Sequence, residues 1–316
     1  MAITRQQRKH RQRLPSLPKR GLLRFIPLLM LLAVIPPVFF HFRLRRFHHM
    51  QLRKCGWLED PPLVCAHGGD ATTAAPNTMG AYHEALRHHV DCIEIDVSRS
   101  YDGVLFALHD RDVQRMTSNH TMKVGYLRSN EIKGLDAGLQ LQHELHNQEV
   151  PTIEDALMLI SKSVKQVILD AKVGPPLYEK GLAQDILSIV QKTHCRNCLV
   201  WAKSDALARD VIKLSKDVKV GYIVTKDPST GATSNLLRMK GADVVGVYHP
   251  LIEDKLMRTL HGRGRSVYAW TVDDEQSMRK MLFQRVDAIV TGHPSLLQNL
   301  MQSMKTECLE EGFSLL

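Results

Sequence analysis

Residues 92–98 (CIEIDVS) and 104–109 (VLFALH) decide the fold of this chain. Both runs are mostly apolar and contain β-branched residues, which is typical of β-strands. Only the five residues 99–103 separate them, whereas a parallel crossover needs about a dozen or more. We therefore expect an antiparallel hairpin, with Asp102-Gly103 as its favoured turn pair.

Two acidic residues occupy one face of the first of these strands. Glu94 and Asp96 are two residues apart, so both carboxylates project to the same side. If that side is the interior of a barrel, the two like charges repel each other unless a cation lies between them. The alternative is a solvated edge strand with both acids outward, which would leave Ile93, Ile95 and Val97 to fill the interior.

The hairpin also places a histidine near these acids. If the turn has two central residues, Tyr101 pairs with Val104 and paired positions sum to 205, which puts His109 opposite Asp96. Cross-strand partners share a face of the sheet. We therefore expect the imidazole of His109 to lie beside the carboxylates as a candidate acid or base.

Outward from the hairpin, strand-like runs alternate with segments long enough for helices, which is the signature of a parallel sheet with crossover helices. The expected strands are 63–67, 92–98, 104–109, 165–171, 198–203, 219–224, 243–248, 266–272 and 287–291. Segments long enough for a helix include 152–162, 178–193, 205–216, 231–240, 252–262 and 274–284. Without the hairpin strand at 104–109, eight parallel strands remain, which predicts a TIM-type (β/α)8 barrel with an inserted β-hairpin. The loop 111–150 is expected to carry short helices at the barrel rim.

The C-terminal ends of barrel strands point into the mouth where catalysis occurs. The first run ends at His67, and the run 165–171 places Asp170 and Lys172 two residues apart at its end. A lone histidine at a strand end is more often structural than catalytic. Asp170 would add a third carboxylate to those of Glu94 and Asp96, and three carboxylates at a barrel mouth suit a hard cation such as Mg²⁺ or Ca²⁺. Lys172 would add a positive charge for an anionic substrate.

The N-terminal segment is strongly basic and contains an apolar run. Residues 1–54 hold thirteen Lys or Arg and no acid, and the apolar run occupies residues 25–40. Three interpretations are open: a signal anchor, a cleaved signal peptide and an organellar transit peptide. An anchor is favoured, because the run is about long enough to cross a thin bilayer and no small-residue cleavage site follows it.

The anchor interpretation divides the chain and sets its expected location. The positive-inside rule predicts a single-pass membrane protein with a cytoplasmic N-terminus and a lumenal or extracellular body, because more bases precede the run than follow it. The expected parts are a basic tail at 1–24, a transmembrane anchor at 25–43, a stalk at 44–61 and a barrel domain at 62–316.

The body of the chain is mildly acidic. Beyond residue 54 it has 29 bases and 33 acids, a net charge of −4, so we expect no nucleic-acid partner. Cys195 and Cys198 form a C-x-x-C pair. Because no second pair lies nearby, this is weak evidence for zinc, and a disulfide or two free thiols is favoured.

An ordered set of short motifs runs through the body. The motifs are His67-Gly68-Gly69, Pro76-Asn77-Thr78, Glu94-Ile95-Asp96-Val97, Asp102-Gly103, His109-Asp110, Asp170-Ala171-Lys172 and Trp270-Thr271-Val272. In order and spacing this set resembles the glycerophosphodiester phosphodiesterase family, over roughly residues 63–300. With an N-terminal anchor, the chain looks like the plant membrane-anchored branch of that family. The resemblance implies a barrel of the phosphodiesterase/phospholipase C-like kind.

The resemblance also implies an activity and a role for each motif. The activity is metal-dependent hydrolysis of glycerophosphodiesters, such as glycerophosphocholine, to sn-glycerol 3-phosphate and an alcohol. The implied roles are His67 and His109 as the general acid and base, Glu94, Asp96 and Asp170 as ligands of Mg²⁺ or Ca²⁺, Lys172 as a phosphate contact, and Trp270 as a wall of the substrate pocket.

The chain departs from the family pattern at two positions. The family usually reads His-Arg-Gly and Pro-Glu-Asn-Thr, but here Gly68 replaces the Arg and Ala75-Pro76 leaves no Glu. Losing a charge-assisted phosphate contact typically costs a few kcal/mol, or about 10²-fold in rate. Two alternatives therefore stay open: a lysophospholipase D-type enzyme acting on membrane lysophospholipids, and a non-catalytic barrel protein.

Overall fold

The chain divides into two compact units in the computed structural model, Met1–Arg53 and Lys54–Leu316. Helix α1 (Lys19–Cys55) accounts for the described part of the first unit and contains three prolines. All other described helices and strands belong to the second unit. The residues that the structure describes are 19–140, 148–226, 229–231 and 234–313.

The prediction of a membrane anchor is wrong. Within the described residues, no helix is both long enough and apolar enough to cross a membrane. Two predictions are therefore withdrawn. They are the anchor at 25–43 and the single-pass topology with a cytoplasmic N-terminus and a lumenal or extracellular body. Most of the predicted basic tail, 1–24, lies outside the described residues.

The second unit contains a closed barrel of eight parallel strands. The strands run in the order β1-β9-β8-β7-β6-β5-β4-β2, and β1 pairs with β2 to close the circle. Their bounds are β1 (Leu63–His67), β2 (Cys92–Arg99), β4 (Gln166–Ala171), β5 (Cys198–Ala202), β6 (Lys219–Val224), β7 (Val244–Tyr248), β8 (Ser266–Trp270) and β9 (Ala288–Thr291). The predicted TIM-type barrel is confirmed.

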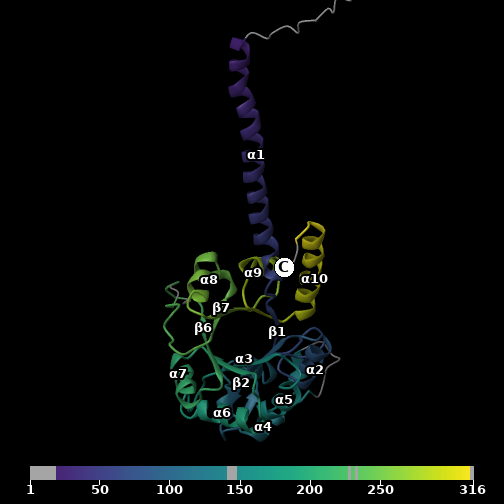
Figure 1. The fold of residues 1–316 in the computed structure, drawn as a ribbon. Helices are drawn as coiled ribbons and strands as arrows, with labels where there is room; N and C mark the ends of the chain where they lie inside the picture. Colours follow the sequence, from purple (N-terminus) through teal and green to yellow (C-terminus); the bar gives the residue numbers. More distant parts are fainter. Residues whose placement is uncertain (1–18, 141–147, 227–228, 232–233, 314–316) are drawn as a thin grey trace, which may run out of the picture. The chain divides into compact units, whose positions relative to one another are not determined.

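Helices lie outside the strands of this barrel, as Figure 1 shows. They are α2 (Met79–Arg87), α5 (Ile153–Ile160), α6 (Leu182–Lys192), α7 (Asp205–Leu214), α8 (Asp254–His261), α9 (Glu275–Gln284) and α10 (Pro294–Glu310), with short 3-10 turns η1 (Gly56–Leu58) and η4 (His249–Leu251). The segment 231–240, although long enough, contains no helix among its described residues. Its polar residues and Gly231, which has a left-handed φ of 67°, favour turns instead.

The inserted hairpin is present, but its register differs from the prediction. Strand β3 (Leu105–Ala107) pairs antiparallel to β2, with Val97 opposite Ala107, so paired positions sum to 204 rather than 205. The turn has three central residues, because Ser100 N donates to Val104 O at 2.9 Å. The third central residue is Gly103, whose φ of 88° suits a three-residue hairpin.

The register shift moves His109 away from its expected partner. Leu108, not His109, faces Asp96, and its backbone N donates to Asp96 O at 3.1 Å. His109 lies beyond the end of β3 and is the N-cap of helix α3 (Asp110–Met116). The predicted pairing of His109 with Asp96 is therefore wrong by one residue.

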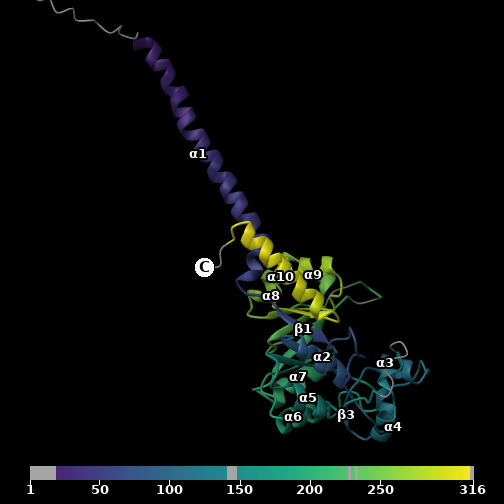
Figure 2. The same ribbon diagram turned by 90° about the vertical axis from the view of Figure 1, so that its right-hand side faces the viewer.

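The loop after the hairpin forms a small core of its own, and it carries short helices as predicted. Besides α3 these are η2 (Val124–Tyr126), α4 (Ser129–Lys133) and η3 (Ala137–Gln140). Figure 2 shows β3, α3 and α4 together on one side of the barrel. Their packed side chains are Phe106, Leu108, Val113, Val124, Ile132, Ala137 and Val150.

The barrel interior is filled by side chains of alternate strand positions. Its largest side chain is the indole of Trp201, which lies against two glycines. A Cβ added at Gly246 would lie 2.7 Å from the Trp201 ring, and one at Gly221 would lie 3.0 Å from Trp201 Cβ. The two glycines therefore make room for this tryptophan below the barrel mouth.

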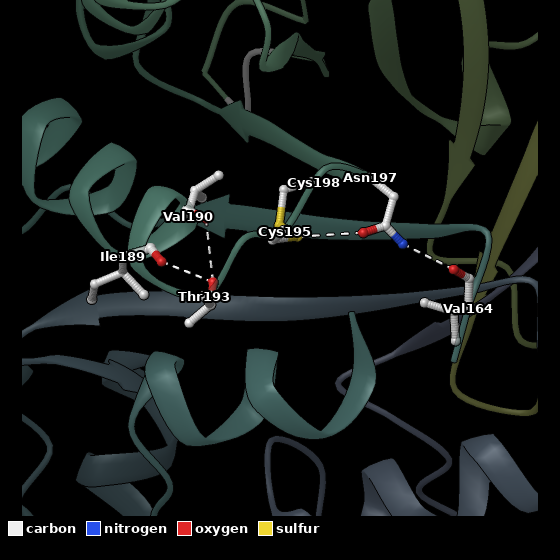
Figure 3. The surroundings of a disulfide bond; sticks show 7 residues. All are labelled: Val164, Ile189, Val190, Thr193, Cys195, Asn197 and Cys198. Atoms are coloured by element: carbon white, nitrogen blue, oxygen red, sulfur yellow. Dashed lines mark hydrogen bonds between the residues drawn. A yellow bond between two sulfur atoms is a disulfide. The ribbon is translucent and has the colours of Figure 1, made fainter. Parts of the chain in front are cut away.

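Four cysteines form two disulfides. Cys55 is bonded to Cys308, and Cys195 to Cys198. Figure 3 shows the second bond between α6 and β5, beside the side chain of Asn197. Because Cys195 and Cys198 are bonded to each other, the zinc interpretation of the C-x-x-C pair is excluded and the disulfide interpretation is confirmed.

Candidate active site

A pocket at the C-terminal ends of the barrel strands gathers most of the residues that the sequence singled out. It is lined by His67, Glu94, His109, Arg111, Asp170, Lys172, Trp201, Lys203, Ile223, Trp270, Thr271 and Val290. Six of the seven candidate residues lie in this wall. The seventh, Asp96, is buried on β2 directly beside Asp170 of β4.

Three carboxylates meet at the base of this site. One oxygen from each of Glu94, Asp96 and Asp170 lies within 4.8 Å of the other two, and all three side chains are buried. Burial and the two neighbouring carboxylates raise the pKa of Glu94 well above its ordinary value. Burial also raises the pKa of Asp170. The site therefore holds more negative charge than its surroundings stabilise.

Lys172 neutralises part of this charge. Its Nζ lies 2.6 Å from Asp96 Oδ1 and also pairs with Asp170. Burial favours the neutral amine, but the nearby carboxylates outweigh it and raise the pKa of Lys172. Burial likewise works to raise the pKa of Asp96, but the Lys172 ammonium holds this pKa below its ordinary value. One ammonium balances only one of the three carboxylates.

The two candidate histidines face this cluster from different elements. His67 Nε2, at the end of β1, lies 3.9 Å from Glu94 Oε2, which also accepts a hydrogen bond from Gly68 N. His109 Nδ1 accepts a hydrogen bond from the backbone N of Arg111 at 3.2 Å. Burial lowers the pKa of His67, and it lowers the pKa of His109 to about 4. Burial therefore favours the neutral form of both imidazoles.

Asn77 holds Asp96 in place, a role that the sequence analysis did not assign. Its Nδ2 donates to Asp96 Oδ2 at 2.9 Å, and its Oδ1 accepts from Asp96 N at 3.1 Å. Asn77 has a left-handed φ of 61°, which asparagine adopts more readily than most residues. The motif Pro76-Asn77-Thr78 was visible in the sequence, but the loop that turns Asn77 toward β2 was not.

Two further cations of the pocket also escaped the sequence analysis. Arg111 Nη2 lies 3.8 Å from Asp96 Oδ2. Lys203 Nζ lies 5.8 Å from the centre of the Trp270 ring, which in turn packs 5.7 Å from the ring of Tyr248. Lys203 follows the end of β5, so its place at a strand end was the available signal.

The residues of the carboxylate cluster fit a divalent cation. Asp170 Oδ1 is buried and accepts no hydrogen bond from any described residue. All three donors are carboxylate oxygens, the ligands that Mg²⁺ and Ca²⁺ prefer. The cluster is therefore a possible acidic metal site, and the kind of ion stays open.

Comparison with known proteins places the chain in a family. Residues 67–296 match the glycerophosphoryl diester phosphodiesterase family. The chain belongs to this family. Glycerophosphodiester phosphodiesterase GDPD4 of Arabidopsis thaliana is 60% identical over 284 residues, which cover 90% of this chain and 87% of that protein. A glycerophosphodiester phosphodiesterase of Caldanaerobacter subterraneus is 28% identical and covers 76% of this chain and 98% of its own length. The predicted family and enzyme class are confirmed.

Solved structures of glycerophosphoryl diester phosphodiesterases and related proteins share the fold. An Oleispira antarctica phosphodiesterase in complex with the product sn-glycerol-3-phosphate has a TM-score of 0.68 at 23% identity and covers 76% of this chain and 97% of its own. A putative glycerophosphodiester phosphodiesterase from Galdieria sulphuraria has a TM-score of 0.66 at 22% identity and covers 76% and 98%. At these identities the likeness concerns the fold alone.

Proposed function

We propose that this chain hydrolyses glycerophosphodiesters, such as glycerophosphocholine, to sn-glycerol 3-phosphate and an alcohol, with Mg²⁺ or Ca²⁺ as cofactor. One observation carries the proposal: three buried carboxylates lie together at the base of a pocket that two histidines line. The name of the Arabidopsis relative and the product bound to the Oleispira phosphodiesterase support the same substrate class.

The carboxylate cluster would hold the cation. Glu94, Asp96 and Asp170 would supply its protein ligands, and Asn77 would keep Asp96 oriented through two hydrogen bonds. A bound divalent ion would offset the charge of the phosphodiester and of its transition state. Lys172, which lines the same pocket, would contact the phosphate.

The two histidines would move the protons of the reaction. One histidine, as the neutral imidazole, would remove a proton from the nucleophile, which is water or the glycerol hydroxyl of the substrate, and the other, as the imidazolium, would protonate the departing alcohol. The hydrogen bond from Arg111 N occupies His109 Nδ1. The neutral imidazole of His109 therefore carries its proton on Nε2, and this nitrogen would donate toward the substrate. Trp270 would line the pocket on the side of β8.

Replacement of the histidines tests this assignment. His67→Ala and His109→Ala should each lower metal-dependent turnover of glycerophosphocholine by about 10²-fold or more. His261→Ala is the matched control, because His261 pairs with Asp287 and does not line the pocket. Full activity of a His67→Ala/His109→Ala double variant, with an unchanged melting temperature, would refute the assignment.

The same assay separates the alternatives. A lysophospholipase D-type enzyme would turn over lysophosphatidylcholine faster than glycerophosphocholine, and we expect the reverse order. A non-catalytic barrel would turn over neither substrate at any metal concentration. The retention of both histidines and of three carboxylates in one site is the reason to expect turnover.

A further inference from the structure

Any side chain at position 68 would be strained and would force its neighbours to shift. Gly68 has a left-handed φ of 66°, and a Cβ added there would lie 2.9 Å from Pro76 Cβ and 3.2 Å from the backbone N of Asn77. The side chain of Pro76, the other departure from the family pattern, therefore lies where a Cβ at position 68 would need room. A guanidinium for the substrate phosphate has to come from another part of the chain.

The three cations that line the pocket differ in the partners that they already have. Lys172 is held in ion pairs by two carboxylates. Lys203 lies over the ring of Trp270. Arg111 is different, because 52% of its side chain is exposed and its closest carboxylate oxygen, on Asp96, is 3.8 Å from Nη2. That distance is beyond hydrogen-bond range.

The guanidinium N–H groups of Arg111 are available to donate hydrogen bonds to a ligand. Its other charged neighbour, Asp112, has Oδ1 at 4.0 Å from Nε, and no described residue accepts a hydrogen bond from the guanidinium. The backbone is fixed at the same point, since Arg111 N donates to His109 Nδ1. A planar fork of N–H groups is therefore anchored two residues from a candidate catalytic imidazole, and such a fork matches two phosphate oxygens.

The charge balance of the site indicates what the guanidinium of Arg111 would bind. Three carboxylates, the Lys172 ammonium and one divalent ion sum to zero, so the negative charge of an incoming phosphodiester has to be matched by the two remaining cations of the pocket, Lys203 and Arg111. We propose that Arg111 binds the phosphate of the substrate, in place of the arginine that position 68 lacks. This inference rests on the proposed function and names a phosphate-binding residue for it.

Substitution of Arg111 with a matched control tests the proposal. Arg209 is the control, because 53% of its side chain is exposed and its Nη2 lies 3.6 Å from Asp205 Oδ2, outside the pocket. With Ca²⁺ present, Arg111→Gln should weaken binding of sn-glycerol 3-phosphate by about 10- to 100-fold in calorimetry, and lower kcat/KM for glycerophosphocholine by a similar factor. Arg111→Lys should recover part of the loss, and Arg209→Gln should match the unmodified protein.

Binding and turnover are measured separately so that the two proposals can fail separately. If the unmodified protein binds sn-glycerol 3-phosphate more tightly than Arg111→Gln but turns over no diester, the proposed function fails and the role of Arg111 stands. Equal binding by the two proteins, or no binding by the unmodified protein, overturns the role of Arg111. Weakened Ca²⁺ binding in Arg111→Gln would also overturn it, because the arginine would then act through Asp96.

Discussion

Asp96 and Asp170 are direct register partners on the neighbouring parallel strands β2 and β4, and both are buried. Like charges held side by side away from water repel each other. The pairing of two strands fixes this contact, so the excess of negative charge is built into the barrel. A divalent ion and the fixed ammonium of Lys172 are what would make the arrangement stable.

Asn77 should control metal affinity through Asp96. Asn77→Gly keeps a residue that accepts the φ of 61° but removes both hydrogen bonds to Asp96. We expect Ca²⁺ affinity to fall by about 10- to 100-fold, measured by calorimetry, because such partners orient the ligands of metal sites. Asn77→Ala should lose as much affinity and some additional stability. Unchanged Ca²⁺ affinity in Asn77→Gly would contradict the role of Asn77.

Replacing Gly69 with alanine should destabilise the protein more than replacing Gly103, although the two glycines have nearly the same φ angle. Their φ angles are 89° and 88°, but a Cβ at Gly69 would lie 2.7 Å from the carbonyl carbon of Ala81, whereas at Gly103 nothing lies within 4 Å. Both changes to alanine should cost about 1–2 kcal/mol for the left-handed backbone. Gly69→Ala should cost about 1–3 kcal/mol more, because the chain must move. Urea unfolding measures the free energy of unfolding of both variants. Equal losses for Gly69→Ala and Gly103→Ala would contradict the close approach of Ala81 to position 69.

The two disulfides should differ in their contribution to stability. Cys55 and Cys308 are 253 residues apart in sequence, whereas Cys195 and Cys198 are three apart. Because a longer closed loop restricts the unfolded chain more, removing the first bond should lower the free energy of unfolding by about 2–5 kcal/mol. Removing the second should cost less. The test is to replace both cysteines of each bond with serine and to compare the two variants by urea unfolding. An equal loss in the free energy of unfolding for the two variants would contradict this prediction.

The low pKa of His109 gives stability a defined pH dependence. Its folded-state value of about 4 lies below the ordinary 6.5, so the unfolded chain binds more protons between these values. The stabilisation is complete above about pH 6.5 and is lost as the pH falls toward 4. In chelator, His109→Gln should therefore show a smaller drop in melting temperature than the unmodified protein over that range. Parallel curves for the two proteins would contradict the lowered pKa.

The strand pattern predicted the barrel because short, mostly apolar runs, such as 198–203 and 287–291, alternate with segments long enough for helices. Prediction failed where a single residue decided the geometry. Asp102-Gly103 correctly indicated a turn, but the turn has three central residues rather than two, and Gly103 is the third. The extra turn residue shifts the pairing of the two strands, so that Leu108 rather than His109 lies opposite Asp96. The apolar run at 25–40 indicated an anchor, which the described part of α1 does not support.

The site was predictable where strands supply it. Strand periodicity put Glu94 and Asp96 on one face, and Asp170 was expected beside them from its place at the end of another strand; the three carboxylates do meet. Asn77 and Arg111 come from a loop and from the start of a short helix, whose paths depend on tertiary packing. No periodicity in the sequence places them beside Asp96.

The central claim is that the three carboxylates hold a divalent ion which hydrolysis requires. Its most direct test is turnover of glycerophosphocholine by the full chain in Mg²⁺ or Ca²⁺, after chelation, and after the metal is restored. We expect release of sn-glycerol 3-phosphate with metal, loss of activity with chelator, and recovery when metal is added back. Equal turnover before and after complete chelation would contradict the claim.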